Sequence, residues 1–401
     1  MSAARGAPAA GDAGPRAASE LRAWLAAHAD EMVSLLVYLA GLESPSTDPA
    51  SQGPVLDAIA SALAPAGFGA RRRSGVSSGG VLLATDGARR GGAPYQLLLG
   101  HSDTVWDHGT LRSMPVRVEG DIVRGPGTFD MKAGLVIAIF AIRALRELGV
   151  ATPVRPALLV TSDEEVGSAE SVRWIRRLAR GADRVLVLEP AAGPDGLVKT
   201  ARKGVADFQL VVHGRAAHAG LEPDAGASAI HEMAMVIGRV LATREGLPGV
   251  TLNVGLIEGG ERPNVIAPEC RAALDVRFER LADGEVVERR LRSLETRARG
   301  TRLEVLGGID RPPLERTPRN VKLWELLRRR AEEIGICVEE APIVGGASDG
   351  NLTSPLAPTI DGLGAVGAGA HAEHEHVLAD SLPKRAALLA WLIAAPPIRD
   401  D

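Results

Sequence analysis

The sequence contains only two cysteines, Cys270 and Cys337, among its 401 residues. They lie far apart and in no metal-binding spacing, so they indicate a reducing compartment or no use of disulfides. Aromatic residues make up only 3% of the chain, and the 46 basic residues form no block. With a net charge of −4, this pattern argues against a nucleic acid partner.

Long apolar runs are also missing. No stretch is long enough to span a membrane, and the N-terminus has no apolar core of signal-peptide length. Residues 1–20, rich in Ala, Gly and Pro, predict a disordered leader. These features favour a cytoplasmic protein that has no membrane partner.

Over residues 21–203, short apolar runs alternate with helical patterns. Apolar residues at helical spacing predict a first helix over residues 21–42. Strand-like runs such as "YQLLLGH", "PALLVTSDEE" and "RVLVLEP" then alternate with helices. This order predicts an α/β fold with a mostly parallel sheet and helices on both faces.

The pattern changes at about residue 204. The order becomes strand, helix, strand, strand, helix, strand, which is typical of a ferredoxin-like α+β sandwich. We therefore expect an inserted domain at residues 204–311. It would interrupt a catalytic domain formed by residues 21–203 and 312–401.

Polar residues with metal-binding or acid–base chemistry follow the predicted strands of the larger domain. In open α/β sheets the carboxyl edge is where binding sites form. Each residue alone has an ordinary explanation, such as a helix cap at Asp130 or a solvated turn at Glu164 and Glu165. Their shared position at one sheet edge favours a site made of His101, Asp103, Asp130, Glu164, Glu165, Glu189 and His371.

Two imidazoles and several carboxylates without thiolates suit zinc, with cobalt or manganese as alternatives. A bridging aspartate can hold two ions about 3.5–4 Å apart, and such a pair stabilises both the attacking and the leaving oxygen of a hydrolysis. The residues alone do not assign each ligand to an ion.

Five motifs occur in one order and spacing: "HSDTV", "GPGTFDMKAG", "DEEVGS", "LEP" and the late "GAH". From about residue 30 to the C-terminus, the chain resembles a family of dinuclear zinc metallopeptidases. This family contains glutamate carboxypeptidase (carboxypeptidase G), acetylornithine deacetylase and succinyl-diaminopimelate desuccinylase. The resemblance implies two divalent ions, zinc by preference, and a hydrolase that cleaves an amide next to a free carboxylate.

The resemblance also implies a ligand assignment. His101, Asp130 and Glu189 would hold one ion, and Asp130, Glu165 and His371 the other, so Asp130 would be the bridge. Asp103 would orient His101 through its second ring nitrogen. Glu164 would be the general base that takes a proton from the water between the ions. The peptide bond after Asp130 is expected to be cis.

In the inserted domain, "GRAAHAG" resembles the family's histidine motif. His218 would reach the partner's active site in a homodimer formed through this domain and stabilise the oxyanion. Asn264 and Arg277 match family positions that meet substrate, and a cationic Arg suits a free carboxylate. Arg311 and Ser348 are further substrate-binding candidates. Without the resemblance, an ordinary surface would be the better explanation for His218, Asn264 and Arg277, and a plain glycine-rich turn is the alternative for Ser348.

The chain departs from its relatives in two places. His374 and His376 follow His371, and we expect both to be exposed. Leu197 stands where glutamate-specific relatives carry a lysine, which argues against a strict glutamate preference. A carboxypeptidase that releases a C-terminal amino acid and an N-acyl-amino-acid deacylase therefore both remain open. An N-carbamoyl hydrolase is disfavoured by Glu189, and a non-catalytic binding protein by the intact ligand set.

Overall fold

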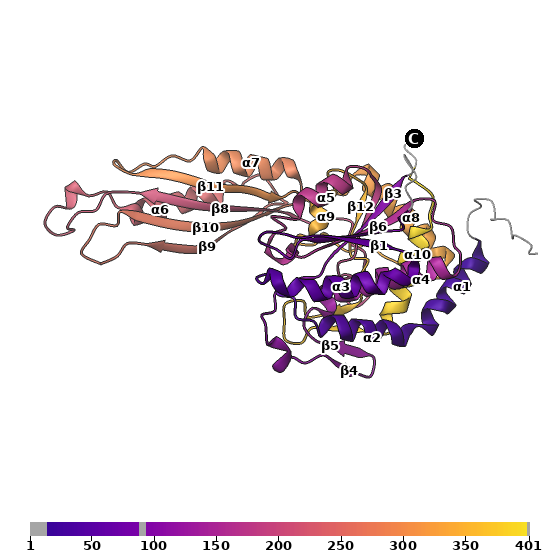
Figure 1. Cartoon of the computed structure of the whole chain (residues 1–401). Helices are drawn as coiled ribbons and strands as arrows, with labels where there is room; N and C mark the ends of the chain where they lie inside the picture. Colours follow the sequence, from indigo (N-terminus) through magenta and orange to yellow (C-terminus); the bar gives the residue numbers. More distant parts are fainter. Residues whose placement is uncertain (1–13, 88–93, 399–401) are drawn as a thin grey trace, which may run out of the picture. The chain divides into compact units, whose positions relative to one another are not determined.

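A computed structural model describes residues 14–87 and 94–398 of the chain (Figure 1). These residues form two compact units. The second unit is larger than the predicted insertion, because it also takes in flanking residues and a later segment. The first unit contains residues 14–87, 94–200, 316–342 and 348–398, and the second contains residues 201–315 and 343–347.

The predicted leader is wrong in its second part. Residues 1–13 lie outside the described residues, but helix α1 spans Pro15–Ala27 and includes the end of the predicted leader. Leu21 and Leu25 are fully buried in the main core, because residues four apart lie on one face of a helix. A second helix, α2, spans Ala29–Ala40, so the single helix predicted over 21–42 is two helices separated at His28.

The central sheet of the first unit is mostly parallel, as predicted. Its order is β1-β2-β6-β3-β7-β12. Neighbours from β6 to β12 run parallel, whereas β1 and β2 pair antiparallel at one edge. The strands span Gly69–Arg73 (β1), Val81–Thr85 (β2), Tyr95–His101 (β3), Arg155–Thr161 (β6), Ala182–Val187 (β7) and Thr359–Ile360 (β12).

Helices cover both faces of this sheet, which confirms the predicted fold class (Figure 1). Leu98 points into one core and its neighbours Leu97 and Leu99 into the other, because successive strand residues face opposite sides. The first core includes α1, α2, α3 (Gln52–Leu63), α4 (Ala133–Glu147), α8 (Pro318–Glu333) and α10 (Ser381–Ile393); the second includes α5 (Val172–Ala179) and α9 (Asp349–Thr353).

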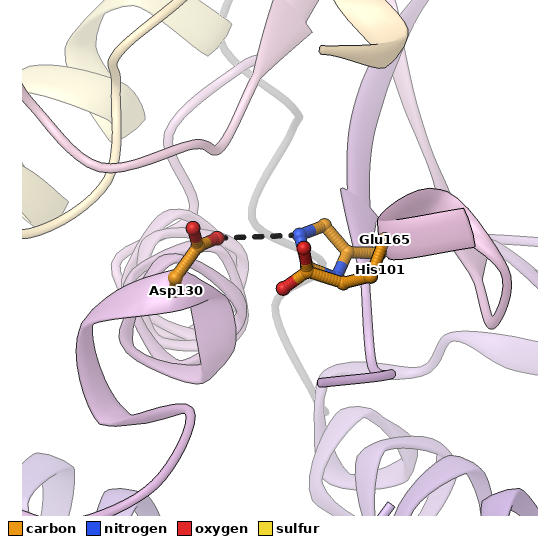
Figure 2. A group of neighbouring side chains, drawn as sticks. All are labelled: His101, Asp130 and Glu165. Carbon is orange, nitrogen blue, oxygen red and sulfur yellow. Dashed lines mark ion pairs between the residues drawn. The ribbon is translucent and has the colours of Figure 1, made fainter. Parts of the chain in front are cut away.

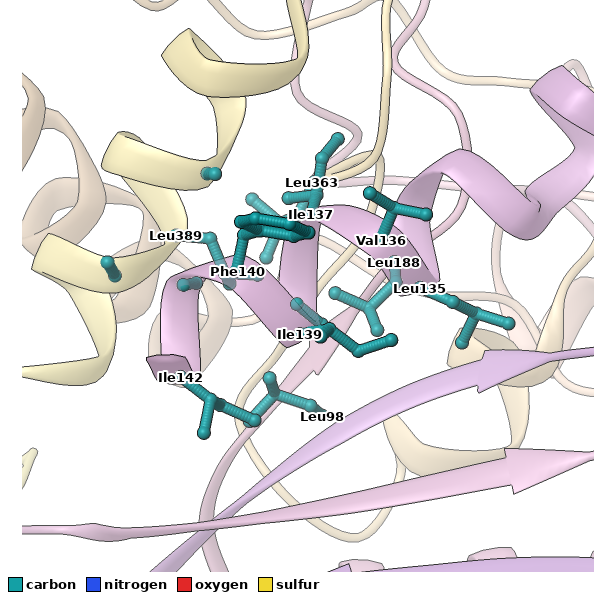
Figure 3. Packing of buried hydrophobic residues seen from close by; sticks show 14 of the residues in the cluster. Leu98, Leu135, Val136, Ile137, Ile139, Phe140, Ile142, Leu188, Leu363 and Leu389 are labelled. Atoms are coloured by element: carbon teal, nitrogen blue, oxygen red, sulfur yellow. The ribbon is translucent and has the colours of Figure 1, made fainter. Parts of the chain in front are cut away.

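Helix α4 is buried on nearly every side, and its apolar residues pack against the sheet and α10 (Figure 3). Each buried Leu, Ile or Phe contributes about 1.5–3 kcal/mol of hydrophobic stabilisation. A Cβ at Gly134 would lie 2.0 Å from the Leu188 carbonyl oxygen, so glycine is required for this close approach. The contact brings the start of α4, just after Asp130, against the segment that carries Glu189.

A small antiparallel sheet in the first unit was not predicted. Its order is β13-β14-β5-β4, and it pairs the segment after His371 with the strand before Asp130. Because these strands are only two or three residues long, they carry little periodicity. They span Arg117–Glu119 (β4), Ile122–Arg124 (β5), Gly367–Ala368 (β13) and His376–Leu378 (β14).

The second unit is a four-stranded antiparallel sheet with two helices on one face, in the order β11-β8-β10-β9. The element order along the chain is the one expected of a ferredoxin-like sandwich. Its elements span Gly204–His213 (β8), Ala229–Ala242 (α6), Thr251–Gly259 (β9), Glu269–Phe278 (β10), Leu281–Arg292 (α7) and Arg302–Arg311 (β11).

The described residues also form short helical turns at Pro49–Ser51, Ala64–Ala66, Thr110–Arg112, Glu164–Val166 and Pro223–Ala225. The turn Thr128–Lys132 has non-helical backbone angles at Asp130 and Met131. Among the helices of residues 14–87 and 94–398, none is both long enough and apolar enough to cross a membrane.

Candidate metal centre

Three parallel strands deliver acidic and imidazole side chains to one sheet edge. His101 is the last residue of β3, Glu165 lies in the turn after β6, and Glu189 follows β7. Because β6, β3 and β7 are adjacent and parallel, their carboxyl ends meet at the same edge. The site is therefore assembled where the strand pattern predicts it.

The remaining two residues arrive on loops. Asp130 lies in the turn Thr128–Lys132 that leads into α4, and its peptide bond to Met131 is cis, as the resemblance predicted. His371 lies between β13 and β14 with a φ of 61°, a left-handed conformation that is uncommon outside glycine. The backbone at both positions is thus set by the loop rather than by a regular element.

The side chains form two groups that share Asp130. In the first group, His101 Nε2 lies 3.4 Å from Asp130 Oδ1 and 3.4 Å from Glu189 Oε1. In the second, His371 Nε2 lies 3.5 Å from Asp130 Oδ2 and 3.1 Å from Glu165 Oε2. Each group thus uses a different oxygen of the same carboxylate.

Three of these four separations, at 3.4 to 3.5 Å, fit ligands of a metal ion better than direct hydrogen bonds. Two ligand atoms bound tetrahedrally at 2.0–2.1 Å to zinc lie about 3.4 Å apart. His101 Nε2 and Asp130 Oδ1 are buried without a hydrogen-bond partner, which is costly unless a cation satisfies them. His101, Asp130 and Glu165 offer ligand atoms within 4.8 Å of one another (Figure 2). The donor set therefore can hold a metal ion.

The carboxylates of the centre favour positive charge on its two histidines. Contacts with the carboxylates of Asp130 and Glu165 raise the pKa of His371 to about 10. Burial opposes a charge on His101, but the surrounding carboxylates outweigh it and raise its pKa well above the usual value. Burial, assisted by repulsion from Asp130, raises the pKa of Glu165. The site as a whole thus demands cationic charge.

Metal binding to the chelator-treated protein is expected to tighten as the pH rises. An incoming ion must displace the proton that His371 retains up to about pH 10. Each displaced proton changes the observed dissociation constant about tenfold per pH unit. Calorimetric titration in buffers of different ionisation enthalpy measures this proton release. An affinity that stays constant between about pH 6 and 9 would contradict the expectation.

Asp103 is a buried residue that contacts both His101 and the turn of Glu164 and Glu165. His101 Nδ1 lies 3.0 Å from the Asp103 carbonyl oxygen and 3.4 Å from its carboxylate, which leaves Nε2 free to bind a metal. The buried Asp103 carboxylate also accepts the backbone N–H groups of Glu164 and Glu165, at 3.3 and 3.2 Å, and the Ser46 hydroxyl at 2.7 Å. One carboxylate therefore links His101 to the Glu164–Glu165 turn.

The other candidates from the inserted domain lie in the second unit. The exposed His218 accepts the backbone N–H groups of Gly220 and Leu221 at Nδ1, which places its proton on the outward Nε2. Its backbone pairs with Val265, next to the exposed Asn264. The structure thus brings His218 and Asn264 together within this unit.

The two arginine candidates differ in exposure. Arg277 is half-buried and already makes a bidentate ion pair with Asp275, at 2.6 to 3.0 Å. Arg311 is 5% exposed, with its guanidinium 3.9 Å from Asp310. Their roles toward substrate remain predictions.

Ser348 has a structural role in the first unit. It is buried, caps the N-terminus of α9 and donates to Asp361 Oδ2 at 2.6 Å. Of the two extra histidines, His374 is exposed as expected. His376 is half-buried in β14, and its Nδ1 faces the His374 carbonyl oxygen at 2.9 Å.

Sequence reasoning missed three residues that build the site: Ser46, Trp106 and Glu375. All are polar or amphipathic side chains outside the recognised motifs, and their contacts join segments far apart in the chain. Glu375 stands in the unusual "AEHEHV" run, which was the one available signal.

The sequence profile of peptidase family M20/M25/M40 matches residues 97–395. The chain belongs to this family. Membership confirms the resemblance drawn from the five motifs and makes the protein a metallohydrolase of peptide or N-acyl amide bonds.

Relatives within the M20/M25/M40 family include both peptidases and deacylases. The chain is 30% identical to carboxypeptidase G2 from Pseudomonas sp. (strain RS-16) over 309 residues, which cover 75% of this chain and 74% of that enzyme. It is 29% identical to acetylornithine deacetylase from Myxococcus xanthus over 367 residues, covering 85% and 91% of the two chains.

Solved structures share the fold of this M20/M25/M40 chain. Aminopeptidase PepT from Bacillus cereus ATCC 10987 has a TM-score of 0.74 at 22% identity and covers 91% of this chain and 98% of its own. The YXEP protein of Bacillus subtilis, described as a dinuclear metal binding peptidase from M20 family, has a TM-score of 0.66 at 13% identity; the coverage is 92% and 98%.

Proposed function

We propose that this M20/M25/M40 chain is a dinuclear metal carboxypeptidase that cleaves an amide next to a free carboxylate and releases a C-terminal amino acid. The observation that carries the proposal is the sharing of Asp130 between two His–carboxylate groups. Carboxypeptidase G2, at 30% identity, supports the choice of reaction.

In the proposed centre, His101, Asp130 and Glu189 hold one ion, and Asp130, Glu165 and His371 hold the other. Zinc fits because imidazole nitrogen and carboxylate oxygen are its usual ligands, with cobalt or manganese as substitutes. The dinuclear relative from Bacillus subtilis supports the number of ions. Ions held by these residues would supply Lewis-acid chemistry, which polarises a carbonyl and lowers the pKa of water.

Glu164 is the proposed general base. It shares a turn with Glu165, and Asp103 holds the backbone N–H groups of both residues. These bonds fix the backbone of the turn, so that the Glu165 side chain is directed at His371 and Asp130. The backbone of the adjacent Glu164 is fixed by the same bonds. Glu164 would accept a proton from the attacking water and deliver it to the leaving amine.

His218→Ala is expected to lower kcat while leaving the metal content unchanged. The His218 tautomer presents an Nε2–H donor, which suits a developing oxyanion.

In the proposed homodimer His218 would act in the partner's site. Mixing His218→Ala with Glu164→Gln chains should then restore about one working site per mixed dimer, because each chain supplies what the other lacks. Activity assays of such mixtures check this. Failure to complement would contradict action between chains.

The proposed homodimer would form through the second unit. Strand β9 lies at an edge of the sheet, and Leu256 and Ile257 on it are 68% and 55% exposed. Unpaired edge strands of this kind readily pair with a second chain.

The free thiols of Cys270 and Cys337 support the proposed cytoplasmic location.

A deacylase of N-acyl amino acids is the second candidate. The acetylornithine deacetylase relative matches 85% of this chain, more than carboxypeptidase G2 does. The two reactions break the same kind of bond, so the shape of the substrate pocket separates them. A panel of N-acetyl, N-succinyl and N-aroyl amino acids, folate-like glutamates and dipeptides tests the choice with zinc- or cobalt-loaded protein. Turnover of N-acyl amino acids alone would favour the deacylase, and binding without any turnover would reject both.

A further inference from the structure

Glu375 is a fully buried carboxylate for which the proposed reaction has no use. Its Oε1 accepts the backbone N–H groups of Phe129 at 2.9 Å and Asp130 at 3.0 Å. Its Oε2 accepts the N–H of Gly127 at 2.9 Å and the indole N–H of Trp106 at 2.9 Å. Four donors therefore satisfy one carboxylate, and such charge-assisted bonds are stronger than neutral ones.

These bonds join the three loops that carry the histidines and the shared aspartate. Trp106 lies in the loop after His101, Gly127 to Asp130 form the turn before α4, and Glu375 follows His371. The backbone pairing of β14 with β5 holds the Glu375 segment beside the strand that precedes Asp130. A single side chain thus connects parts of both His–carboxylate groups.

We propose that Glu375 is a positioning residue that sets the spacing of the two ions by fixing the Asp130 loop, an inference that rests on the proposed dinuclear centre. Only an acceptor-only group suits this place, because three backbone N–H groups point at it. A glutamine amide would present N–H donors to at least one of them. The side chain of Lys132, two residues after Asp130, is buried and donates to the Leu42 carbonyl oxygen at 2.8 Å, which adds a further bond to the same turn.

The test measures metal binding rather than activity alone. Glu375→Gln preserves the size of the side chain but removes the acceptor from two of the four donors, whichever oxygen the amide nitrogen replaces. Ligand-supporting residues of this kind change metal affinity by about 10- to 100-fold when mutated. We expect a loss in that range for the weaker of the two binding steps, measured by competition with a chromophoric chelator. The d–d spectrum of the cobalt-loaded protein should also change, since it reports ligand geometry.

Two further variants test whether a change in metal binding comes from the position of the Asp130 loop, from the lost negative charge or from a failure to fold. Glu373→Gln makes the same chemical change on the same segment, but at an exposed position. It should leave both affinities and the cobalt spectrum unchanged. Trp106→Phe removes one of the four donors to Glu375 and should shift the cobalt spectrum with a smaller loss of affinity. If Glu375→Gln fails to fold, Trp106→Phe still carries the test.

The outcomes distinguish the two proposals. A wild-type chain that binds no ion contradicts the dinuclear centre itself. A wild-type chain that binds two ions, with variants at Glu375 and Trp106 that bind them with unchanged affinity and spectrum, overturns only the role of Glu375. A lower melting temperature in Glu375→Gln with unchanged binding would likewise show a purely structural role. Equal losses in Glu373→Gln and Glu375→Gln would assign the effect to charge.

Discussion

Glu164→Gln is expected to lower kcat by more than about a thousandfold while both metal ions remain bound. The amide cannot accept a proton from the attacking water, but it occupies the same space as the carboxylate. The ligand atoms of the two groups come from other residues, and Asp103 holds the turn through backbone N–H groups that the substitution leaves intact. Steady-state kinetics and elemental analysis of the same preparation check both halves of this expectation.

Glu165→Gln is the matched contrast for this experiment. It makes the same chemical change at the adjacent residue, whose Oε2 lies 3.1 Å from His371 Nε2. It should therefore lose metal as well as turnover. A Glu164→Gln variant with near-native kcat would show that another group is the base. Loss of metal from that variant would show that the two glutamates do not divide their roles as proposed.

Asp130→Asn is expected to remove both ions and to reduce turnover to background. The two oxygens of Asp130 face different histidines, so neutralising this one side chain weakens both groups at once. An amide also offers a single neutral oxygen where two anionic ones are required. Metal content per chain, measured after dialysis against metal-free buffer, gives the direct readout.

Glu189→Gln provides the comparison for Asp130→Asn. Glu189 belongs to the first group, where its Oε1 lies 3.4 Å from His101 Nε2. Its loss should weaken one ion and leave the second bound. Chelation of the wild-type chain should abolish turnover, and added zinc or cobalt should restore it. If Asp130→Asn retained two ions per chain, the proposed bridge would be wrong.

Much of the fold follows from local patterns in the chain. Apolar runs such as "YQLLLGH" become buried strands because their residues are apolar on both faces, which is typical of a parallel sheet covered by helices. The ferredoxin-like order of the second unit likewise follows from the alternation of strand and helix patterns. Local patterns failed where the chain is rich in small residues. Residues 15–20, the start of α1, were missed because their Ala-rich sequence resembles a leader. They extend a helix that the burial of Leu21 and Leu25 stabilises.

The site likewise contains residues that the strand pattern could place and residues that it could not. His101, Glu165 and Glu189 could be placed at one edge from the sequence, because each follows a strand of one parallel sheet. The position of Asp130 between the two groups was implied by the resemblance but not by the strand pattern, since it depends on loops that meet through contacts between distant segments. Ser348 was a substrate-binding candidate through the resemblance alone. The fold buries its side chain and directs its hydroxyl to Asp361, and its role toward substrate stays a prediction.

The amino-acid sequence alone determined which chemical groups reach the sheet edge, because strand ends and residue types are local properties of the chain. Only the tertiary structure decided how Asp130 is divided between two histidines and how Glu375 joins three loops. Those contacts bring together residues more than two hundred positions apart, such as Glu375 and Asp130. No periodic pattern records such a pairing, because its geometry exists only after the core has packed.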